Sequence, residues 1–109
     1  MKKSYKQMLE NKQVTEKLLL SCLATCEVVI SNNAKCEGIY GYHQPARALS
    51  YEAERLEWSA YREKIRKALQ QKYEMKKIKD MTKTHTDKVA QRTVKAVVKL
   101  IDSGDFVLV

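Results

Sequence analysis

Ten cations in the second half of the chain are the residues whose types and spacing offer the clearest chemistry. The set comprises Arg62, Arg66, Lys72, Lys76, Lys79, Lys83, Lys88, Arg92, Lys95 and Lys99. The last four recur at intervals of four, three and four residues, which on a helix places them within a sector about 60° wide. Lys72 and the three lysines after it repeat these intervals, and Arg62 and Arg66 are four residues apart. Several cations on one face can follow a phosphate backbone, so the pattern predicts nucleic-acid binding by these ten residues.

The charge distribution supports this prediction. Lys and Arg total 21 against 13 acids, a net charge of +8. Residues 62–99 contain 13 of the cations and only four acids, so the whole excess lies in one basic region. A helix face that merely keeps the protein soluble is the simpler alternative, but such faces usually mix both signs. An acidic protein surface is the other partner that this charge would attract.

Other chemistry has weaker support. A zinc site could use four residues of suitable type, Cys22, Cys26, Cys36 and His43. Cys22 and Cys26, however, lie in the most apolar stretch of the sequence, where cysteines are more typical of a core. The zinc alternative stays open. Cys36 with His43 lacks the flanking motif of a nucleophilic pair, and three glycines form no phosphate-binding loop. We therefore expect no enzyme, no metal and no cofactor.

The elements that must position these residues are predicted to be helices, because the chain of 109 residues has only three glycines and one proline. Residues 4–31 suggest one bent helix or two short ones, with Ser4 and Gln7 as a capping box and Thr15 as a further N-cap. Residues 18–30 should form the central core helix, although Val28 to Ile30 would also suit a strand. Residues 31–44 suggest a loop.

A long helix is predicted from Pro45, a favourable first residue, to residue 80. One of its apolar stripes comprises Leu49, Ala53, Leu56 and Ala60; the other comprises Trp58, Tyr61, Ile65 and Leu69. A long helix with two apolar faces either contacts two partners or continues beyond the core of its own monomer, and the second option implies self-association. We assign the second stripe to an interface of a homo-oligomer, with packing of its aromatic residues in the core as the alternative. The helix is predicted to be interrupted at 81–87. A last helix follows at 88–102, capped by Thr86 or Asp87 and ended by Gly104. A short strand is predicted at the C-terminus.

The segment RTVKAVVKLIDSGDFVLV, residues 92–109, resembles the end of a winged-helix DNA-binding domain. Thr93, Val94, Val97, Leu100, Gly104 and Phe106 carry the likeness. The resemblance implies that Arg92, Lys95 and Lys99 face a DNA groove and that the final residues begin a wing. The preceding MTKTHTD departs from a helix-turn-helix pattern, so membership of that family is not assigned.

Together these observations predict an all-α domain over residues 1–109, a bundle of three to four helices with the basic region at 62–99. Its expected function is nucleic-acid binding, with DNA favoured over RNA, as a regulator or accessory factor of a phage or mobile element. The alternative is a protein-binding module or inhibitor that docks on an acidic or nucleic-acid-binding surface of a larger target. The 13-residue apolar run is shorter than the roughly 20 residues of a membrane span, and no secretory signal is recognisable, so we expect a cytoplasmic protein without membrane contact.

Overall fold

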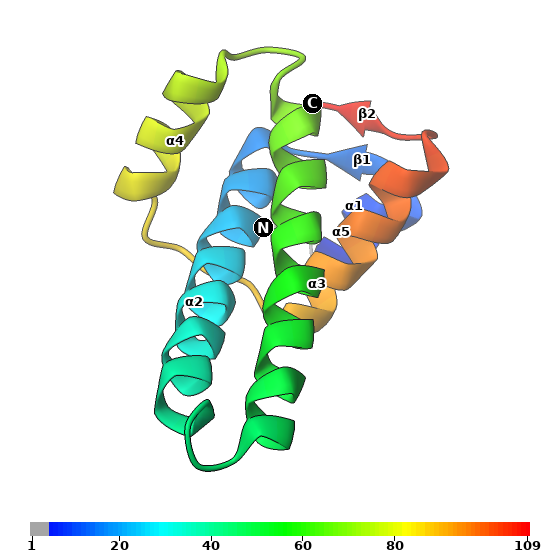
Figure 1. Cartoon of the computed structure of the whole chain (residues 1–109). Helices are drawn as coiled ribbons and strands as arrows, with labels where there is room; N and C mark the ends of the chain where they lie inside the picture. Colours follow the sequence, from blue (N-terminus) through cyan, green and yellow to red (C-terminus); the bar gives the residue numbers. More distant parts are fainter. Residues whose placement is uncertain (1–4) are drawn as a thin grey trace.

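The protein folds into an all-α bundle, as predicted. A computed structural model describes residues 5–109, and within them five helices and two very short strands follow one another. They are α1 (Tyr5–Glu10), β1 (Gln13–Val14), α2 (Glu16–Tyr40), α3 (Pro45–Leu69), α4 (Met75–Thr84), α5 (Gln91–Ser103) and β2 (Val107–Leu108). The long helices α2 and α3 form an antiparallel hairpin, and α4 and α5 pack on its two sides (Figure 1). Ser4 of the predicted capping box lies outside the described residues.

Helix α2 is the core helix of the bundle. Thr15 caps its N-terminus, because the Thr15 hydroxyl accepts a hydrogen bond from the backbone N–H of Leu18 at 3.0 Å. Leu18, Leu19, Cys22 and Leu23 are fully buried, which confirms the predicted central segment. Val28 to Ile30 are helical rather than a strand.

The predicted loop at 31–44 is wrong for most of its length, since α2 continues to Tyr40. Contacts with α3 hold this extension: the Glu37 carboxylate accepts from Arg55 at 2.6 Å, and the rings of Tyr40 and Tyr51 stack at 5.7 Å. Gly41 ends the helix at a close approach, because a Cβ there would lie 2.8 Å from the carbonyl oxygen of Glu37. Only four residues, 41–44, turn the chain into α3.

The single helix predicted over 45–80 is also wrong. Pro45 is the first residue of α3, as expected, but α3 ends at Leu69 and the chain folds back through a turn into α4. The reversal brings Ile78 into the core with no exposed surface and packs Tyr73 and Met81 against it. A straight continuation would leave these apolar side chains in water, so burial overrides the unbroken helix propensity.

Helix α5 begins three residues later than predicted. Ala90, rather than Thr86 or Asp87, occupies the N-cap position and makes no side-chain cap. Gly104 ends the helix in the left-handed conformation, with φ of +72°, as a C-terminal glycine commonly does. The predicted C-terminal strand is present as β2, but it pairs in parallel with β1, Gln13 opposite Val107, and forms no hairpin wing.

The stripe assigned to an oligomer interface lies inside the chain instead. Trp58 is 1% exposed, and Ile65 and Leu69 are fully buried in the core cluster. Tyr61 packs edge-on against Trp58, with ring centroids 5.2 Å apart. Trp58, Ile65 and Leu69 therefore offer no surface to a second copy, and Tyr61 is partly buried against the same core. None of the helices in residues 5–109 has the length and apolar character needed to cross a membrane.

Candidate nucleic-acid interface

Two of the predicted phosphate-binding residues are already engaged inside the protein. The Glu27 carboxylate accepts hydrogen bonds from Arg62 at 3.2 Å and from Arg66 at 3.4 Å, and Arg66 also donates to Glu63 at 3.1 Å. The arginine side chains are only 24% and 14% exposed. Two acids thus offset two cations, and the sequence-based assignment of Arg62 and Arg66 as free phosphate ligands does not fit this network.

The network leaves two donors unused. The Nε atoms of Arg62 and Arg66 are buried and have no hydrogen-bond acceptor. A buried donor without an acceptor is costly, typically by about 1–3 kcal/mol. Arg66 also lines a pocket, so one of these unsatisfied donors belongs to a residue of the pocket lining.

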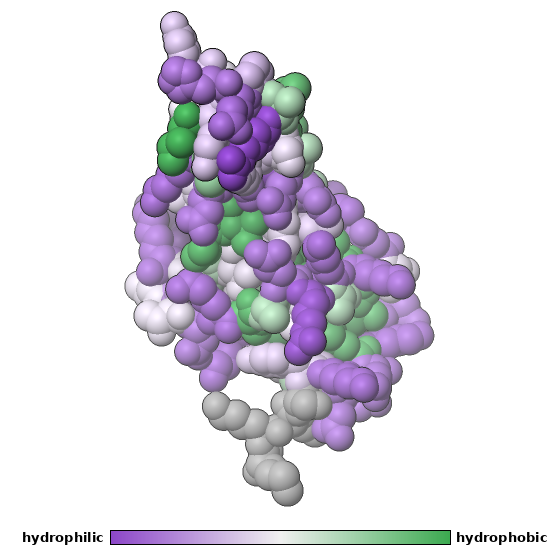
Figure 2. All heavy atoms as spheres, turned by 90° about the horizontal axis from the view of Figure 1, so that it is seen from below, coloured by the Kyte–Doolittle hydropathy of each residue, from purple (hydrophilic) through white to green (hydrophobic). Residues whose placement is uncertain are grey.

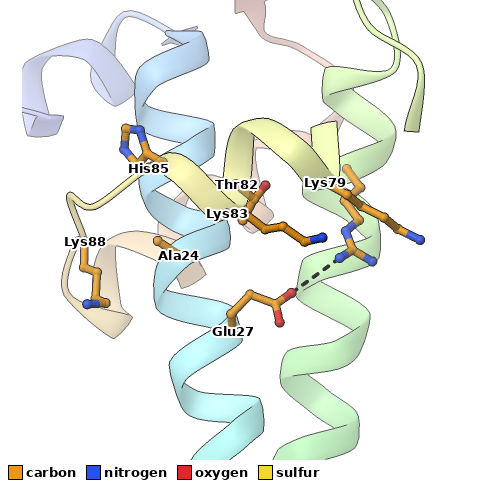
Figure 3. A pocket seen from close by; sticks show the side chains of 8 residues that line it. Ala24, Glu27, Lys79, Thr82, Lys83, His85 and Lys88 are labelled. Atoms are coloured by element: carbon orange, nitrogen blue, oxygen red, sulfur yellow. Dashed lines mark hydrogen bonds and ion pairs between the residues drawn. The ribbon is translucent and has the colours of Figure 1, made fainter. Parts of the chain in front are cut away.

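A pocket of about 410 Å³ lies beside this network, between α2, α3 and α4. Its cationic lining comes from three segments: Arg66 from α3, Lys79 and Lys83 from α4, and Lys88 from the linker that follows α4. Figure 3 shows Lys79 and Lys83 extending from α4 toward the side of α3, while His85 and Lys88 lie on the opposite side of the view, on the linker that follows α4. We call Lys79, Lys83 and Lys88 the lysine cluster.

The lysine cluster is not neutralised by acids of its own chain. All three lysines are exposed, and no ion pair within residues 5–109 includes any of them. Glu27 is the one carboxylate in the pocket lining, and it is already shared by two arginines. The lining of the pocket therefore carries an excess of positive charge, because its carboxylate, Glu27, is already paired with arginines.

Two polar contacts with α2 fix the linker that carries Lys88. The buried hydroxyl of Ser21 lies 2.8 Å from Nε2 of His85. The Thr25 hydroxyl donates to the carbonyl oxygen of Val89 at 2.7 Å and accepts from the Val89 N–H at 3.1 Å. Sequence reasoning missed these residues, although two hydroxyls four residues apart and one glutamate inside an apolar helix were visible signs of a polar contact.

Replacing Thr25 with valine should loosen the linker. Thr25→Val keeps the side-chain shape but leaves both backbone groups of Val89 without this partner, so we expect a loss of about 1–3 kcal/mol in the free energy of unfolding. Thr93→Val is the matched control, because the Thr93 hydroxyl makes no hydrogen bond within residues 5–109, so its effect should stay within about 0.5 kcal/mol. Urea denaturation of both variants measures the difference; equal stabilities would show that the Thr25 contacts do not hold the linker.

The remaining predicted cations are not brought into the pocket. Lys72 lies in the turn before α4 and Lys76 on α4, whereas Arg92, Lys95 and Lys99 are exposed on α5. Val94 and Val97 are buried, so the predicted polarity of α5 is confirmed. Lys88, however, precedes α5 and therefore does not continue the stripe of cations formed by Arg92, Lys95 and Lys99 on that helix. Because α4 and α5 flank the hairpin on different sides, the ten cations do not share one face (Figure 1).

The residues considered for zinc are not assembled into a metal site. Within residues 5–109, no group of three or more His, Cys, Asp or Glu side chains could hold a metal ion. Cys22 and Cys26 are fully buried in the core, and burial raises the pKa of each thiol to about 12. Both thiols stay protonated at neutral pH, which suits hydrophobic packing and neither metal binding nor nucleophilic attack.

Thiol labelling should separate the three cysteines. Cys36 is partly exposed, so it should react with a maleimide in the native protein, while Cys22 and Cys26 should react only after denaturation. Mass spectrometry of native and urea-treated samples should show one and three labels, respectively. Rapid native labelling at Cys22 or Cys26 would contradict the packing of α2.

Fold and site together define a small helical protein with an uncompensated cationic pocket on one side of a helical hairpin. No protein-family model, curated protein or solved structure matches the chain.

Proposed function

We propose that the protein is a non-enzymatic nucleic-acid-binding protein that contacts backbone phosphates through the lysine cluster. The observation that carries this proposal is that Lys79, Lys83 and Lys88 line one pocket and have no ion-pair partner among the described residues. Lysine is a flexible point charge suited to phosphate contacts that do not depend on base sequence. Such contacts release counterions from the nucleic acid and supply salt-dependent affinity.

The pocket adds a feature that a merely solvated face lacks. Arg66, whose side chain is 14% exposed, contributes to its lining, and Lys76 extends the exposed positive charge along α4. One phosphate group held near Arg66 and neighbouring phosphates held by the lysine cluster would form a continuous contact. The exposed cations of α5 then act as a separate, weaker site of attraction.

The finer assignment follows the sequence prediction. We propose DNA rather than RNA as the polymer, and a role as a regulator or accessory factor of a phage or mobile element. Three cysteines without a disulfide among the described residues suit a reducing compartment, so we propose the cytoplasm as its location.

A labelled DNA duplex of about 20 base pairs, titrated with protein at about 50 mM salt and followed by fluorescence anisotropy, tests the proposal. We expect saturable binding that weakens steeply toward about 200 mM salt. A single strand and an RNA duplex in parallel titrations distinguish the polymers. Absence of binding to every polymer at low salt would contradict the proposal.

The same lysines would also suit an acidic protein surface, which is the alternative partner. A pull-down from native extract, carried out with and without nuclease, separates the two. Nucleic acid in the bound fraction, released by nuclease, supports the proposal; a protein partner retained after nuclease treatment favours the protein-binding module.

A further inference from the structure

The outer face of α3 carries an apolar stripe that nothing in residues 5–109 covers. Ala46, Leu49, Ala53, Leu56 and Ala60 are all exposed, and the two leucines are 63% and 55% exposed. At 100° per residue these positions lie roughly opposite Trp58, one of the residues through which α3 joins the core. We call these five residues the outer stripe.

The spacing of the outer stripe is that of a coiled-coil seam. Intervals of three, four, three and four residues place alanine at one seam position of each heptad and leucine at the other. Isolated exposed leucines are ordinary on a protein surface, but five consecutive apolar seam positions over about 21 Å of helix are a typical helix-packing surface. Seen from the α2–α3 turn, hydrophilic side chains cover most of the molecule and hydrophobic atoms emerge between them in patches (Figure 2).

We propose that a second copy of the chain packs antiparallel on the outer stripe. When the two α3 helices run in opposite directions about a point midway between Ala53 and Leu56, each of the four layers built from Leu49, Ala53, Leu56 and Ala60 joins a leucine of one copy to an alanine of the other. Ala46 lies outside these layers, opposite Glu63 of the second copy. Leu49 meets Ala60 of the second copy, and Ala53 meets Leu56. Parallel packing in register would instead alternate leucine–leucine with alanine–alanine layers, which suit different helix separations.

The flanking charges select the same direction. Parallel packing would set Glu52 of each copy against Glu57 of the other, two like-charge contacts across the seam. Antiparallel packing sets Glu52 against Ser59 and Glu57 against Ser50, so neither acid faces another acid. The seam is short, and we therefore expect a weak dimer with a Kd of about 10–100 µM. This inference is independent of the proposed function.

Sedimentation velocity between about 5 µM and 500 µM tests the dimer. The wild-type protein should shift from monomer to dimer over this range, and Leu56→Glu should weaken association at least about tenfold because two added carboxylates enter the seam. Gln71→Glu adds the same charge at an exposed position in the turn after α3 and should leave association unchanged. Circular dichroism checks that both variants remain folded. A monomeric wild type, or a Leu56→Glu variant that associates normally, would overturn the proposal.

One further variant tests the direction of packing. Ser50→Lys should tighten the antiparallel dimer several-fold because the new lysine faces Glu57 of the second copy on both sides of the two-fold axis. In a parallel pair this position faces no acid. Unchanged or weakened association of Ser50→Lys would contradict the antiparallel alignment.

Discussion

Replacing the lysine cluster with glutamine, as Lys79→Gln, Lys83→Gln and Lys88→Gln together, is expected to lower the affinity for a DNA duplex roughly 100-fold at about 0.1 M salt. The reason is counterion release: each lost phosphate contact removes close to one counterion from the binding equilibrium. All three side chains are exposed and unpaired within the described residues, so the variant should keep its helicity and stability. Fluorescence anisotropy gives the affinity, and circular dichroism with urea denaturation verifies the fold.

The chain supplies a matched control for this variant on α5. Changing Arg92, Lys95 and Lys99 to glutamine removes the same total charge from exposed positions outside the pocket. If the pocket is the main phosphate site, this control should lose only about fivefold in affinity through the weaker overall field. A larger loss in the α5 control than in the lysine-cluster variant would move the binding surface to α5 and contradict the pocket as the principal site.

Truncating Trp58 to alanine is expected to have the largest effect on stability, a loss of about 3–5 kcal/mol in the free energy of unfolding. Trp58 is 1% exposed and is the largest fully buried side chain, packed against Tyr61 and the core residues of α2 and α5. Because small domains are stable by only about 5–15 kcal/mol in total, the variant should be partly unfolded or close to it.

Two further variants allow the contribution of Trp58 to stability to be measured even if Trp58→Ala does not fold. Trp58→Phe should retain enough packing to fold and to show an intermediate loss in urea denaturation. Leu56→Ala lies two residues away on the same helix but 55% exposed, so its effect on monomer stability should stay within about 0.5 kcal/mol. Measurements at low protein concentration avoid any contribution from dimerisation. Similar losses for Trp58→Ala and Leu56→Ala would show that α3 is turned differently from the packing described above.

Local signals in the sequence were sufficient for the fold class and several helix ends. Thr15, Pro45 and Gly104 act as predicted because each works through its own backbone or its nearest neighbours. The two errors in helix length have a tertiary cause. Helix α2 extends past Asn33 because α3 supplies partners for Glu37 and Tyr40, and α3 stops at Leu69 because the chain gains burial of Ile78 by turning back.

The candidate site was predictable only as a region of charge. The sequence identifies each cation, but it does not show which ones its own acids neutralise. Arg62 and Arg66 are neutralised by Glu63 and by Glu27, an acid 35 and 39 residues earlier in the chain. Lys88, in contrast, lines the same pocket as Lys79 and Lys83 because the linker bends over α2. Both apolar stripes of α3 were likewise visible in the sequence, but their periodicity does not tell which stripe faces the core. In the structure the stripe that contains Trp58 faces the core, and the outer stripe is exposed.

The most direct test of the pocket as the phosphate site is the slope of log K against log salt concentration, measured for the wild-type protein and for the triple lysine-cluster variant. We predict a steep dependence for the wild type and a slope smaller by roughly 2–3 in the variant, because three phosphate contacts are lost at about 0.9 each. Equal slopes for the two proteins would contradict this prediction.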